Sequence, residues 1–360
     1  MARRSAPPRA PTATVALGGT GLAGSAGLDG AVPDVGQELR AWVDGQADDV
    51  PLPGGGRSWA RFEVLADLAG RDLSLGRLAE GHLDALAILA ELGAPRTGPG
   101  VYGVWAASPG ELVATPCDSG WWLRGTKPFC SGAGLLSRAL VVADTADHGT
   151  RLFDLDVARV DVDDGSWPAV GMADSASNRV SWPGVAVAGE QAVGLPGAYT
   201  GRIGFWWGAV GVAACWWGGA RALLEVVADD LARHRPGDAE MAEVGVGWAT
   251  LEGAGAALRQ AATAIDGHDH DDVERARRLA LVTRQVVHQA CVAVLGRAAA
   301  AGGARPICLD ARQARRSADL YAYLAQHHAP RDAAALGRMV LDERAAGPGG
   351  PIPSGPLPRP

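Results

Sequence analysis

The spacing of apolar residues changes twice along the chain, and these changes limit the folds that it can adopt. From residue 59 to 93, apolar side chains such as Phe62 and Leu65 recur at helical spacing. From 101 to 195, short runs of β-favouring residues alternate with turn residues. After Gly201, long apolar segments again show helical spacing. The sequence therefore predicts helices, then a β region, then helices.

This order predicts an α+β multidomain fold. The middle runs are typical of an antiparallel sheet, and four helical segments in series predict a C-terminal four-helix bundle. We expect 59–95 and 202–342 to be mainly helical and 101–195 to be mainly antiparallel β. The predicted divisions are a flexible Gly/Pro-rich leader over 1–55, an N-terminal helical domain over 56–98, a middle β domain over 99–197, a C-terminal helical bundle over 198–344 and a flexible tail over 345–360.

Charge and cysteine content argue against several functional classes. A net charge of -7 and a pI near 5.6 do not suit a surface for nucleic acid or anionic membranes. No uninterrupted apolar stretch is long enough to span a bilayer, and the N-terminus is a poor signal peptide. The five cysteines are scattered without a CxxC pair, which predicts free thiols in a reducing compartment. We expect a cytoplasmic protein.

Two motifs resemble binding signatures but have simpler explanations. Gly19, Gly21 and Gly24 have dinucleotide-fingerprint spacing, yet the following "SAGLDGAVPD" cannot open the helix that such a site needs. The segment "GHDHDD" places its polar residues at adjacent loop positions, which rarely converge on a metal. We interpret the first as part of the leader and expect Asp271 or Asp272 to cap the next helix. The sequence predicts no metal site.

The loop "GTKPFCSGAG", residues 125–134, combines small residues with a lysine, an aromatic and a serine. It is not a phosphate-binding Walker loop, because three residues separate Lys127 from the serine and no GK[ST] occurs. A strand pair with a bent tip is the better interpretation. Phe129 would form a flat wall and Ser131 would offer a hydroxyl, which suits a planar ring with acceptors at its edge.

This segment resembles the acyl-CoA dehydrogenase superfamily. "DSGWWLRGTKPFCSGA" is similar to the family's "dGyvlnGtKxfItnG", with Phe129, Cys130 and Ser131 at the triplet that faces the flavin. "GMADSASNRVSWPGVAVAGEQAVG" resembles "GxxxSxxxxvxFxdVxVPxxxxlG", and "GRIGFWWGAVGVAACWWGGARALLEVVADDL" resembles the first bundle helix, with Arg202 at its start. The resemblance covers roughly 59–342 and implies an FAD-dependent oxidoreductase.

Other family motifs are altered here. The flavin and substrate motif "EPxxGSD" is reduced to "WAASPGEL", which leaves Trp105 and Ser108 in that neighbourhood. The R-x-x-FG motif that serves the adenine half of FAD is replaced by "HRPGDAEM", and the later "LGG.G" loop survives only around Gly296. The resemblance thus implies the site of the flavin ring more firmly than the site of the dinucleotide tail.

The catalytic base is the largest departure. The family takes the α-proton with a glutamate from a late "YEG" segment or from just before the arginine at the start of the bundle, where this chain has Gly201. The late segment reads "SADLYAYLAQHH", and Asp319 is its only carboxylate. Asp319 is one candidate base, with a solvated helix aspartate as the alternative. His327 or His328 is another candidate, as in the family's monooxygenase-like branch, and helix-end histidines are the alternative.

The resemblance implies α,β-oxidation of a small acyl thioester, as acyl-CoA or on a carrier. Two alternatives stay open: a flavin monooxygenase on the same scaffold, and a degenerate non-catalytic subunit that joins an active homologue in a hetero-oligomer. Without the usual glutamate, little ordinary acyl-CoA dehydrogenase activity is expected. Through the bundle we expect a homodimer or a homotetramer.

Overall fold

Three helices begin the described part of the chain. The computed structural model describes residues 34–346 except 108–110, 147–148 and 268–271. Asp72 caps the third helix, since its side chain accepts hydrogen bonds from the Ser74 and Leu75 amides. The helices are α1 (Val35–Gln46), α2 (Ser58–Arg71) and α3 (Leu73–Glu91), with a 3-10 turn η1 (Ala47–Asp49) after the first.

The prediction of a flexible leader through residue 55 is wrong for 34–55. Asp34 caps α1, and Leu39 and Trp42 are buried against the rest of the protein. The glycines and prolines on both sides of this short helix obscured its apolar spacing in the sequence. Residues 1–33, including the three glycines with fingerprint spacing, lie outside the described residues.

The middle region forms the predicted, mostly antiparallel sheet. Among the described residues the strand order is β6-β7-β3-β2-β4-β5-β8, and β1 pairs with β4. The pairings of β1 and β2 with β4 are parallel, which the sequence did not predict, and the others are antiparallel. The strands are β1 (Tyr102–Trp105), β2 (Val113–Cys117), β3 (Gly120–Cys130), β4 (Arg138–Thr145), β5 (Thr150–Asp156), β6 (Asp161–Asp163), β7 (Asn178–Ala188) and β8 (Ala192–Val193).

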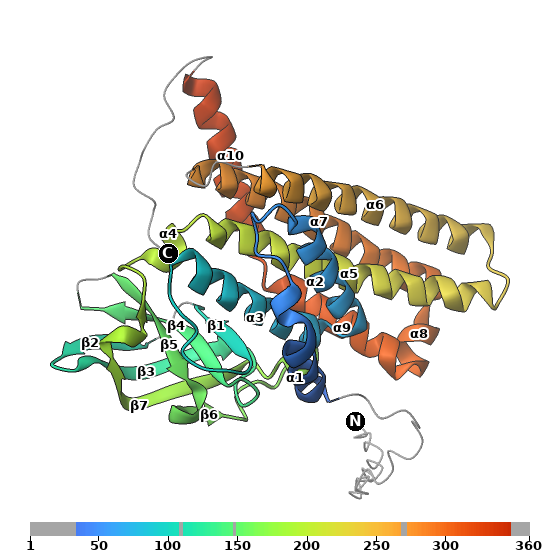
Figure 1. The fold of residues 1–360 in the computed structure, drawn as a ribbon. Coiled ribbons are helices and arrows are strands. Elements are labelled where there is room, and N and C mark those ends of the chain that lie inside the picture. Colours follow the sequence, from blue (N-terminus) through green and yellow to red (C-terminus); the bar gives the residue numbers. More distant parts are fainter. Residues whose placement is uncertain (1–33, 108–110, 147–148, 268–271, 347–360) are drawn as a thin grey trace, which may run out of the picture. The chain divides into compact units, whose positions relative to one another are not determined.

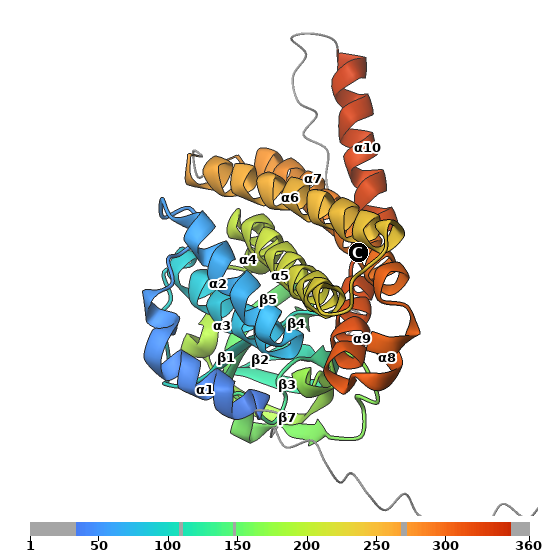
Figure 2. The same ribbon diagram turned by 90° about the vertical axis from the view of Figure 1, so that its right-hand side faces the viewer.

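The C-terminal region forms the predicted helical bundle, in which α5, α6, α7 and α9 are the four helices that the sequence indicated (Figure 2). Helix α2 also packs along α5, so the N-terminal helices extend the bundle. Asp272 caps α7 by accepting a hydrogen bond from the Arg275 amide, as expected. The helices are α4 (Ala198–Gly201), α5 (Gly204–Ala232), α6 (Asp238–Asp266), α7 (Val273–Gly302), α8 (Ala304–Leu309), α9 (Ala311–Ala325) and α10 (Ala329–Ala346).

Helices α5 and α7 are long and apolar enough, by length and composition alone, to cross a membrane. In α5, 72% of the most apolar window is buried inside the protein, as in the core helix of a globular fold. In α7 the buried share is 39%, and Val282, Val286 and Val292 are exposed. Exposed apolar residues on one bundle helix are typical of a surface that contacts another protein chain.

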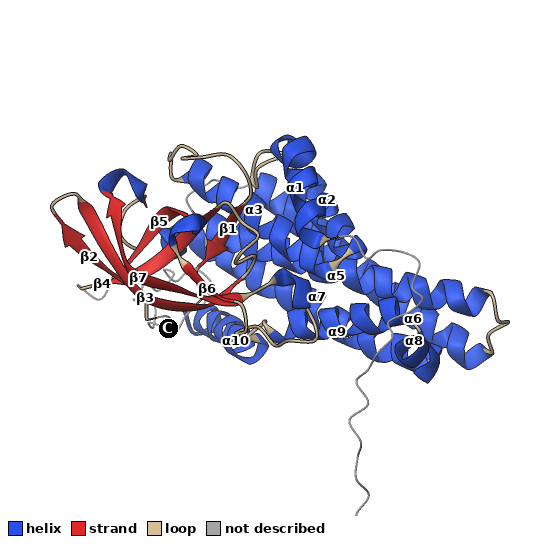
Figure 3. Cartoon of the chain, turned by 90° about the horizontal axis from the view of Figure 1, so that it is seen from below, coloured by secondary structure: helices blue, strands red, loops and turns tan. Residues whose placement is uncertain are grey.

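The sheet lies beside the helices, and α3 packs against β1 (Figures 1 and 3). The largest hydrophobic cluster continues across both changes of secondary structure. It includes Leu75 of α3, Leu123 of β3 and Trp216 of α5. The described residues from Asp34 onward belong to one compact unit, and the division into separate domains stays a prediction.

Candidate functional site

The loop at the end of β3 presents an exposed aromatic ring in a strained backbone. The register between β3 and β7 shifts between Lys127 and Cys130, which marks a bulge. Phe129 has φ 57°, a left-handed conformation that is costly for a bulky residue, and its exposed fraction is 60%. The ring meets Trp167 edge-on, with 6.4 Å between centroids. Such strain persists when surrounding structure imposes it, and it occurs most often at functional sites.

Three buried side chains support this loop from behind. The Trp105 indole donates a hydrogen bond of 2.9 Å to the carbonyl of Ser131. Cys130 points into the core, where burial raises the pKa of its thiol to about 12. Lys127 is also buried, and its ammonium donates to the carbonyl of Ala107 at 2.9 Å, so it does not reach out to a phosphate. The loop therefore exposes Phe129, keeps Ser131 half-buried and withdraws Cys130 and Lys127.

A row of three serine hydroxyls leads inward from the loop. The oxygens of Ser131 and Ser177 are 2.9 Å apart, and those of Ser177 and Ser175 are also 2.9 Å apart. Ser175 then donates to the carbonyl of Met172 at 2.7 Å. The Gly132 amide donates to the Ser175 carbonyl at 2.7 Å, which fixes the loop to the turn η3 (Ala173–Ser175). The sequence marked this segment by resemblance but gave no sign of the hydroxyl row.

Asp319 holds helix α9 against the same turn. The Met172 amide donates to Oδ1 of Asp319 at 2.6 Å, and Arg315 approaches Oδ2 at 3.5 Å. The contact is tight, because a Cβ on Gly171 would lie 2.1 Å from the carbonyl oxygen of Ala318. Burial raises the pKa of Asp319, while the Met172 amide and Arg315 oppose that shift. With both oxygens engaged, this carboxylate is placed to support the loop.

Of the two candidate histidines, His327 is buried and His328 is exposed. The His327 ring lies among Trp216, at 5.3 Å, and His288, at 4.7 Å between centroids. Burial, together with Arg284 and His288, lowers the pKa of His327 to about 4, so the ring is neutral at pH 7. His327 lies just after the end of α9, eight residues after Asp319. Because eight helical residues span about 12 Å, the two candidate bases are separated by about that length along the helix.

Arg284 sets the tautomer of His327. Its Nη2 lies 3.2 Å from Nδ1 of His327, and a guanidinium can only donate. Nδ1 also faces Oδ2 of Asp332, at the longer distance of 3.5 Å. The shorter Arg284 contact favours Nδ1 as an acceptor, which places the proton of the neutral ring on Nε2. That atom is buried and has no hydrogen-bond partner among the described residues. His327 therefore keeps a buried N–H group that has no partner among the described residues.

A buried ion pair that the sequence did not reveal lies on the bundle side of α3. Arg77 Nη1 is 2.6 Å from Glu80 Oε2, and Arg61 and Asp84 are close enough to influence the pair electrostatically. Burial is the largest influence and raises the pKa of Glu80, and Arg77 opposes it. The signal available in the sequence was polar residues at i, i+3 and i+7 on an otherwise apolar helix.

Arg202 stabilises the start of the bundle. Its guanidinium is 3.0 Å from Glu91 and 3.7 Å from Asp84, both on α3, and it lies over the Tyr199 ring at 5.5 Å. The Gly204 amide also donates to Glu91 at 2.9 Å. These contacts join the beginning of α5 to α3.

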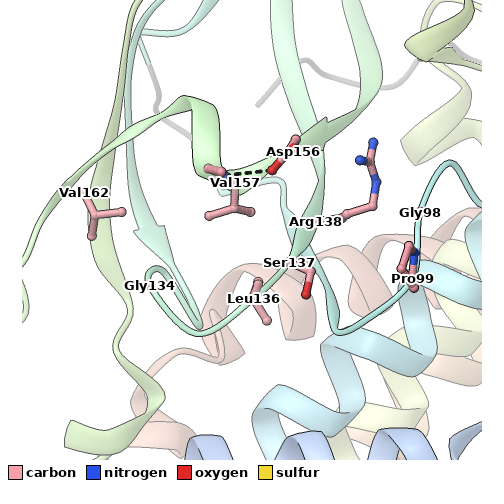
Figure 4. Close-up of a pocket in the computed structure, with 10 residues that line it drawn as sticks. Gly98, Pro99, Gly134, Leu136, Ser137, Arg138, Asp156, Val157 and Val162 are labelled. Carbon is pink, nitrogen blue, oxygen red and sulfur yellow. Dashed lines mark hydrogen bonds between the residues drawn. The ribbon is translucent and has the colours of Figure 1, made fainter.

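Two cavities lie near predicted site residues. One of about 430 Å³ opens beside the segment that follows Ser131 (Figure 4). The charged side chains that line this cavity already have hydrogen-bond partners within the protein. Arg138 donates to Asp154 at 2.8 Å, and Asp156 accepts from the Ala158 amide. Its lining residues are Gly98, Pro99, Gly134, Leu136, Ser137, Arg138, Asp156, Val157, Ala158 and Val162.

The other cavity, of about 310 Å³, includes Gly296 of α7 together with Gln313, Ser317 and Tyr321 of α9. Gln313 is buried, and its Oε1 has no partner among the described residues. Gly296 is thus separate from the network that links Trp105, Ser131 and Asp319. Ser108 lies outside the described residues, as do His268 and His270. Within the described part of the chain, no group of three metal-ligating side chains occurs.

No protein-family model matches the sequence, and no curated protein matches it. Among solved structures, the fold is similar to dibenzothiophene monooxygenase TdsC from Paenibacillus sp. A11-2, with 22% identity, a TM-score of 0.71 and coverage of 85% of this chain and 95% of that one. XiaF from Streptomyces sp. is 18% identical, with a TM-score of 0.68 and coverage of 90% and 93%. KijD3 is 18% identical, with a TM-score of 0.69 and coverage of 85% and 91%. These similarities confirm the predicted fold.

Proposed function

We propose that the protein is a flavin-dependent oxidoreductase that acts on a small molecule, and that its reaction is a monooxygenation. The strained, exposed Phe129 beside Ser131 is the observation that carries this proposal. A flat apolar ring with a hydroxyl at its side fits the face and polar edge of a flavin ring. Trp105 holds the Ser131 carbonyl in place, and the Ser175 carbonyl holds the Gly132 amide. When bound, a flavin supplies two-electron transfer and, once reduced, reaction with oxygen.

Known complexes of structures with this fold support a flavin of either size. TdsC has been solved with FMN and indole, XiaF with FADH2 and glycerol, and KijD3 with FMN and a dTDP-sugar. FAD is our proposal for this chain, because the cavity at Gly296 could accept the dinucleotide tail that FMN lacks. Phe129 would cover the ring face and Ser131 would contact its edge.

His327 favours monooxygenation over desaturation. Desaturation needs a base to take a proton from carbon, whereas Asp319 is tied to Met172 and His327 carries its proton on Nε2. An N–H donor in a buried site suits an oxygen atom of a substrate that gains negative charge during the reaction. The low pKa of His327 keeps this donor neutral throughout the physiological range.

The second candidate function is α,β-oxidation of an acyl thioester. The buried Arg77–Glu80 pair is the observation that favours it, since a carboxylate with a raised pKa suits proton transfer near neutral pH. We test the two reactions with flavin-loaded protein. Oxygen uptake that depends on reduced flavin and a small aromatic or carbonyl substrate supports monooxygenation. Bleaching of the oxidised flavin by an acyl-CoA supports desaturation, and a protein that binds no flavin supports a non-catalytic subunit.

We further propose a cytoplasmic homo-oligomer formed through the bundle. All five cysteines are free, which suits a reducing compartment. The exposed valines of α7 and the exposed Trp248 of α6 provide apolar surface for a second copy. Light scattering during size-exclusion chromatography measures the mass directly, and a monomer at micromolar concentration would contradict this proposal.

A further inference from the structure

The turn η3 and the residue before it, Met172, hold both residues of the loop that we assign to the flavin. On one side, the Ser175 carbonyl accepts a hydrogen bond of 2.7 Å from the amide directly after Ser131. On the other side, the Met172 carbonyl accepts from the Trp167 indole at 3.0 Å, and the Trp167 ring meets Phe129 edge-on. A movement of this turn is therefore passed on to both Ser131 and Phe129.

The conformation of this turn is not one that its own residues prefer. Met172 has φ 59° and Ala176 has φ 41°, so a residue other than glycine is left-handed on each side of η3. Such conformations cost stability and persist where surrounding contacts impose them. The turn thus depends on contacts with other parts of the protein.

Arg315 of α9 makes the charged contacts that hold the turn. Its Nη2 lies 2.5 Å from Oδ2 of Asp174 in η3 and 2.8 Å from Oδ2 of Asp72 at the start of α3. Its Nε lies 3.5 Å from Oδ2 of Asp319, whose other oxygen accepts from the Met172 amide at 2.6 Å. One guanidinium therefore joins η3, α3 and α9.

The same guanidinium separates three carboxylates that would otherwise repel one another. The side chain of Asp319 is 4% exposed and that of Asp72 is 21% exposed, so water screens their charges only in part. The neighbouring Arg316 points elsewhere, because it donates to the carbonyls of Gly70 and Arg71 at the end of α2. Removal of the first guanidinium would thus leave η3 without its attachment and next to uncompensated negative charge.

We propose that Arg315 is a positioning residue for the flavin site. It acts through η3, which in turn orients Phe129 and Ser131. The inference rests on the proposed function, because it takes the loop after β3 to hold the flavin. Since Arg315 lies on α9, the packing of the helical bundle sets the geometry of a site that the sheet presents.

The first measurement uses the full chain before flavin is added. Hydrogen–deuterium exchange with mass spectrometry follows the amides of 129–134 and 171–177. We expect faster exchange in both segments of Arg315→Met, because the turn loses its ion pair to α9. Arg316→Met is the matched control, since it removes contacts between α9 and α2 and should leave both segments unchanged.

The second measurement is the dissociation constant of FMN and of FAD in a double-mutant cycle. Arg315→Met and Asp174→Asn should each weaken binding about 3- to 10-fold and alter the spectrum of bound flavin, because the loop is no longer pre-organised. The double variant should bind no more weakly than Arg315→Met, since both changes remove one contact. Asp174 is 42% exposed, so Asp174→Asn keeps the test available if Arg315→Met does not fold.

Asp72→Asn is the control for the shared guanidinium. Asparagine caps helices about as well as aspartate, so α3 keeps its cap while the ion pair to the same Nη2 atom is removed. Because Asp72 lies on α3 and not in the turn, flavin affinity and spectrum should stay close to those of the wild type. Circular dichroism confirms that each variant is folded.

Three results would overturn the inference while the wild type still binds flavin and the proposed function stands. They are wild-type flavin binding in folded Arg315→Met, losses in Arg315→Met and Arg316→Met that are equal, and an additive loss in the double variant with Asp174→Asn. A wild type that binds neither FMN nor FAD would overturn the proposed function and, with it, this inference.

Discussion

The loop at Phe129 and the helical core at Glu80 differ in how they accommodate an energetically unfavourable group: the loop leaves it exposed, and the core encloses it. The loop holds an aromatic residue in an unfavourable backbone conformation and leaves it exposed. The core encloses Glu80, whose side chain is 7% exposed, and pairs it with the oppositely charged Arg77, whose side chain is 22% exposed. The first arrangement costs stability without covering apolar surface, and the second makes stability depend on an intact pair. The difference indicates that the loop serves binding, while the core pair chiefly maintains the packing of α3.

Breaking the core pair should have the largest effect on stability. Arg77→Met leaves Glu80 buried without its partner, and we expect the free energy of unfolding to fall by about 3–5 kcal/mol. The penalty should grow as the pH rises, because an unpaired buried carboxyl takes up a proton more readily than the unfolded one. Urea denaturation measures it. The double variant Arg77→Met/Glu80→Gln should recover most of the loss.

The exposed pair between Arg221 and Asp67 provides the control. Arg221→Met should cost less than about 1 kcal/mol, because surface pairs contribute little. Equal losses of stability in Arg77→Met and Arg221→Met would show that the Arg77–Glu80 pair contributes no more to stability than an exposed pair.

Two buried histidines predict the next largest effect, a loss of stability in acid. Burial lowers the pKa of His327 and that of His82 to about 4, below the usual 6.5. Their contribution is complete above pH 6.5 and is lost as the pH falls towards 4, since the unfolded chain takes up protons first. One pKa unit corresponds to about 1.4 kcal/mol, so the total is a few kcal/mol. His327→Gln should flatten the profile, and His328→Gln, at an exposed position, should not.

The loop strain predicts a smaller effect that distinguishes two variants lacking the aromatic ring. Phe129→Gly and Phe129→Ala both remove the wall, but only glycine tolerates the left-handed backbone without strain. We expect the glycine variant to be more stable than the alanine variant by about 1 kcal/mol. Thermal melts followed by circular dichroism give the comparison. A more stable alanine variant would mean that the loop is not strained in solution.

The smallest expected effect concerns the dinucleotide tail. A Cβ at Gly296 would meet no atom within 4 Å, so a larger side chain can enter the cavity without disturbing the helix. If the tail occupies this cavity, Gly296→Leu should weaken FAD binding several-fold and leave FMN binding unchanged. Fluorescence titration with both flavins measures this, and Gly245→Leu, at another open helical glycine on α6, is the control. Equal affinity for FAD in Gly296→Leu and the wild type would show that the dinucleotide tail does not occupy the cavity at Gly296.

The sequence predicted the order of secondary structure because each region repeats one spacing many times. It also predicted that Phe129 and Ser131 share a loop, because they are neighbours in the chain. It did not predict that Ser177, Met172 and Asp319 continue the network. Those contacts join residues up to 147 positions apart and depend on how α9 packs against the turn at Gly171.

For the same reason, the sequence could not choose between adjacent histidines. His327 and His328 differ only in which one faces inward at the end of α9. Helix α1 was missed because glycines and prolines surround a helix of only 12 residues. Composition near a residue did not predict its structure where contacts with residues distant in the sequence determine that structure.

Flavin binding by the wild type, Phe129→Ala and Ser131→Ala, followed by visible absorbance, tests the central claim most directly. We predict that the wild type binds flavin and shifts its spectrum. Phe129→Ala should alter the spectrum through lost ring packing, and Ser131→Ala should weaken binding by roughly 0.5–1.5 kcal/mol, about one hydrogen bond. Wild-type affinity and spectrum in both variants would contradict the claim that this loop holds the flavin.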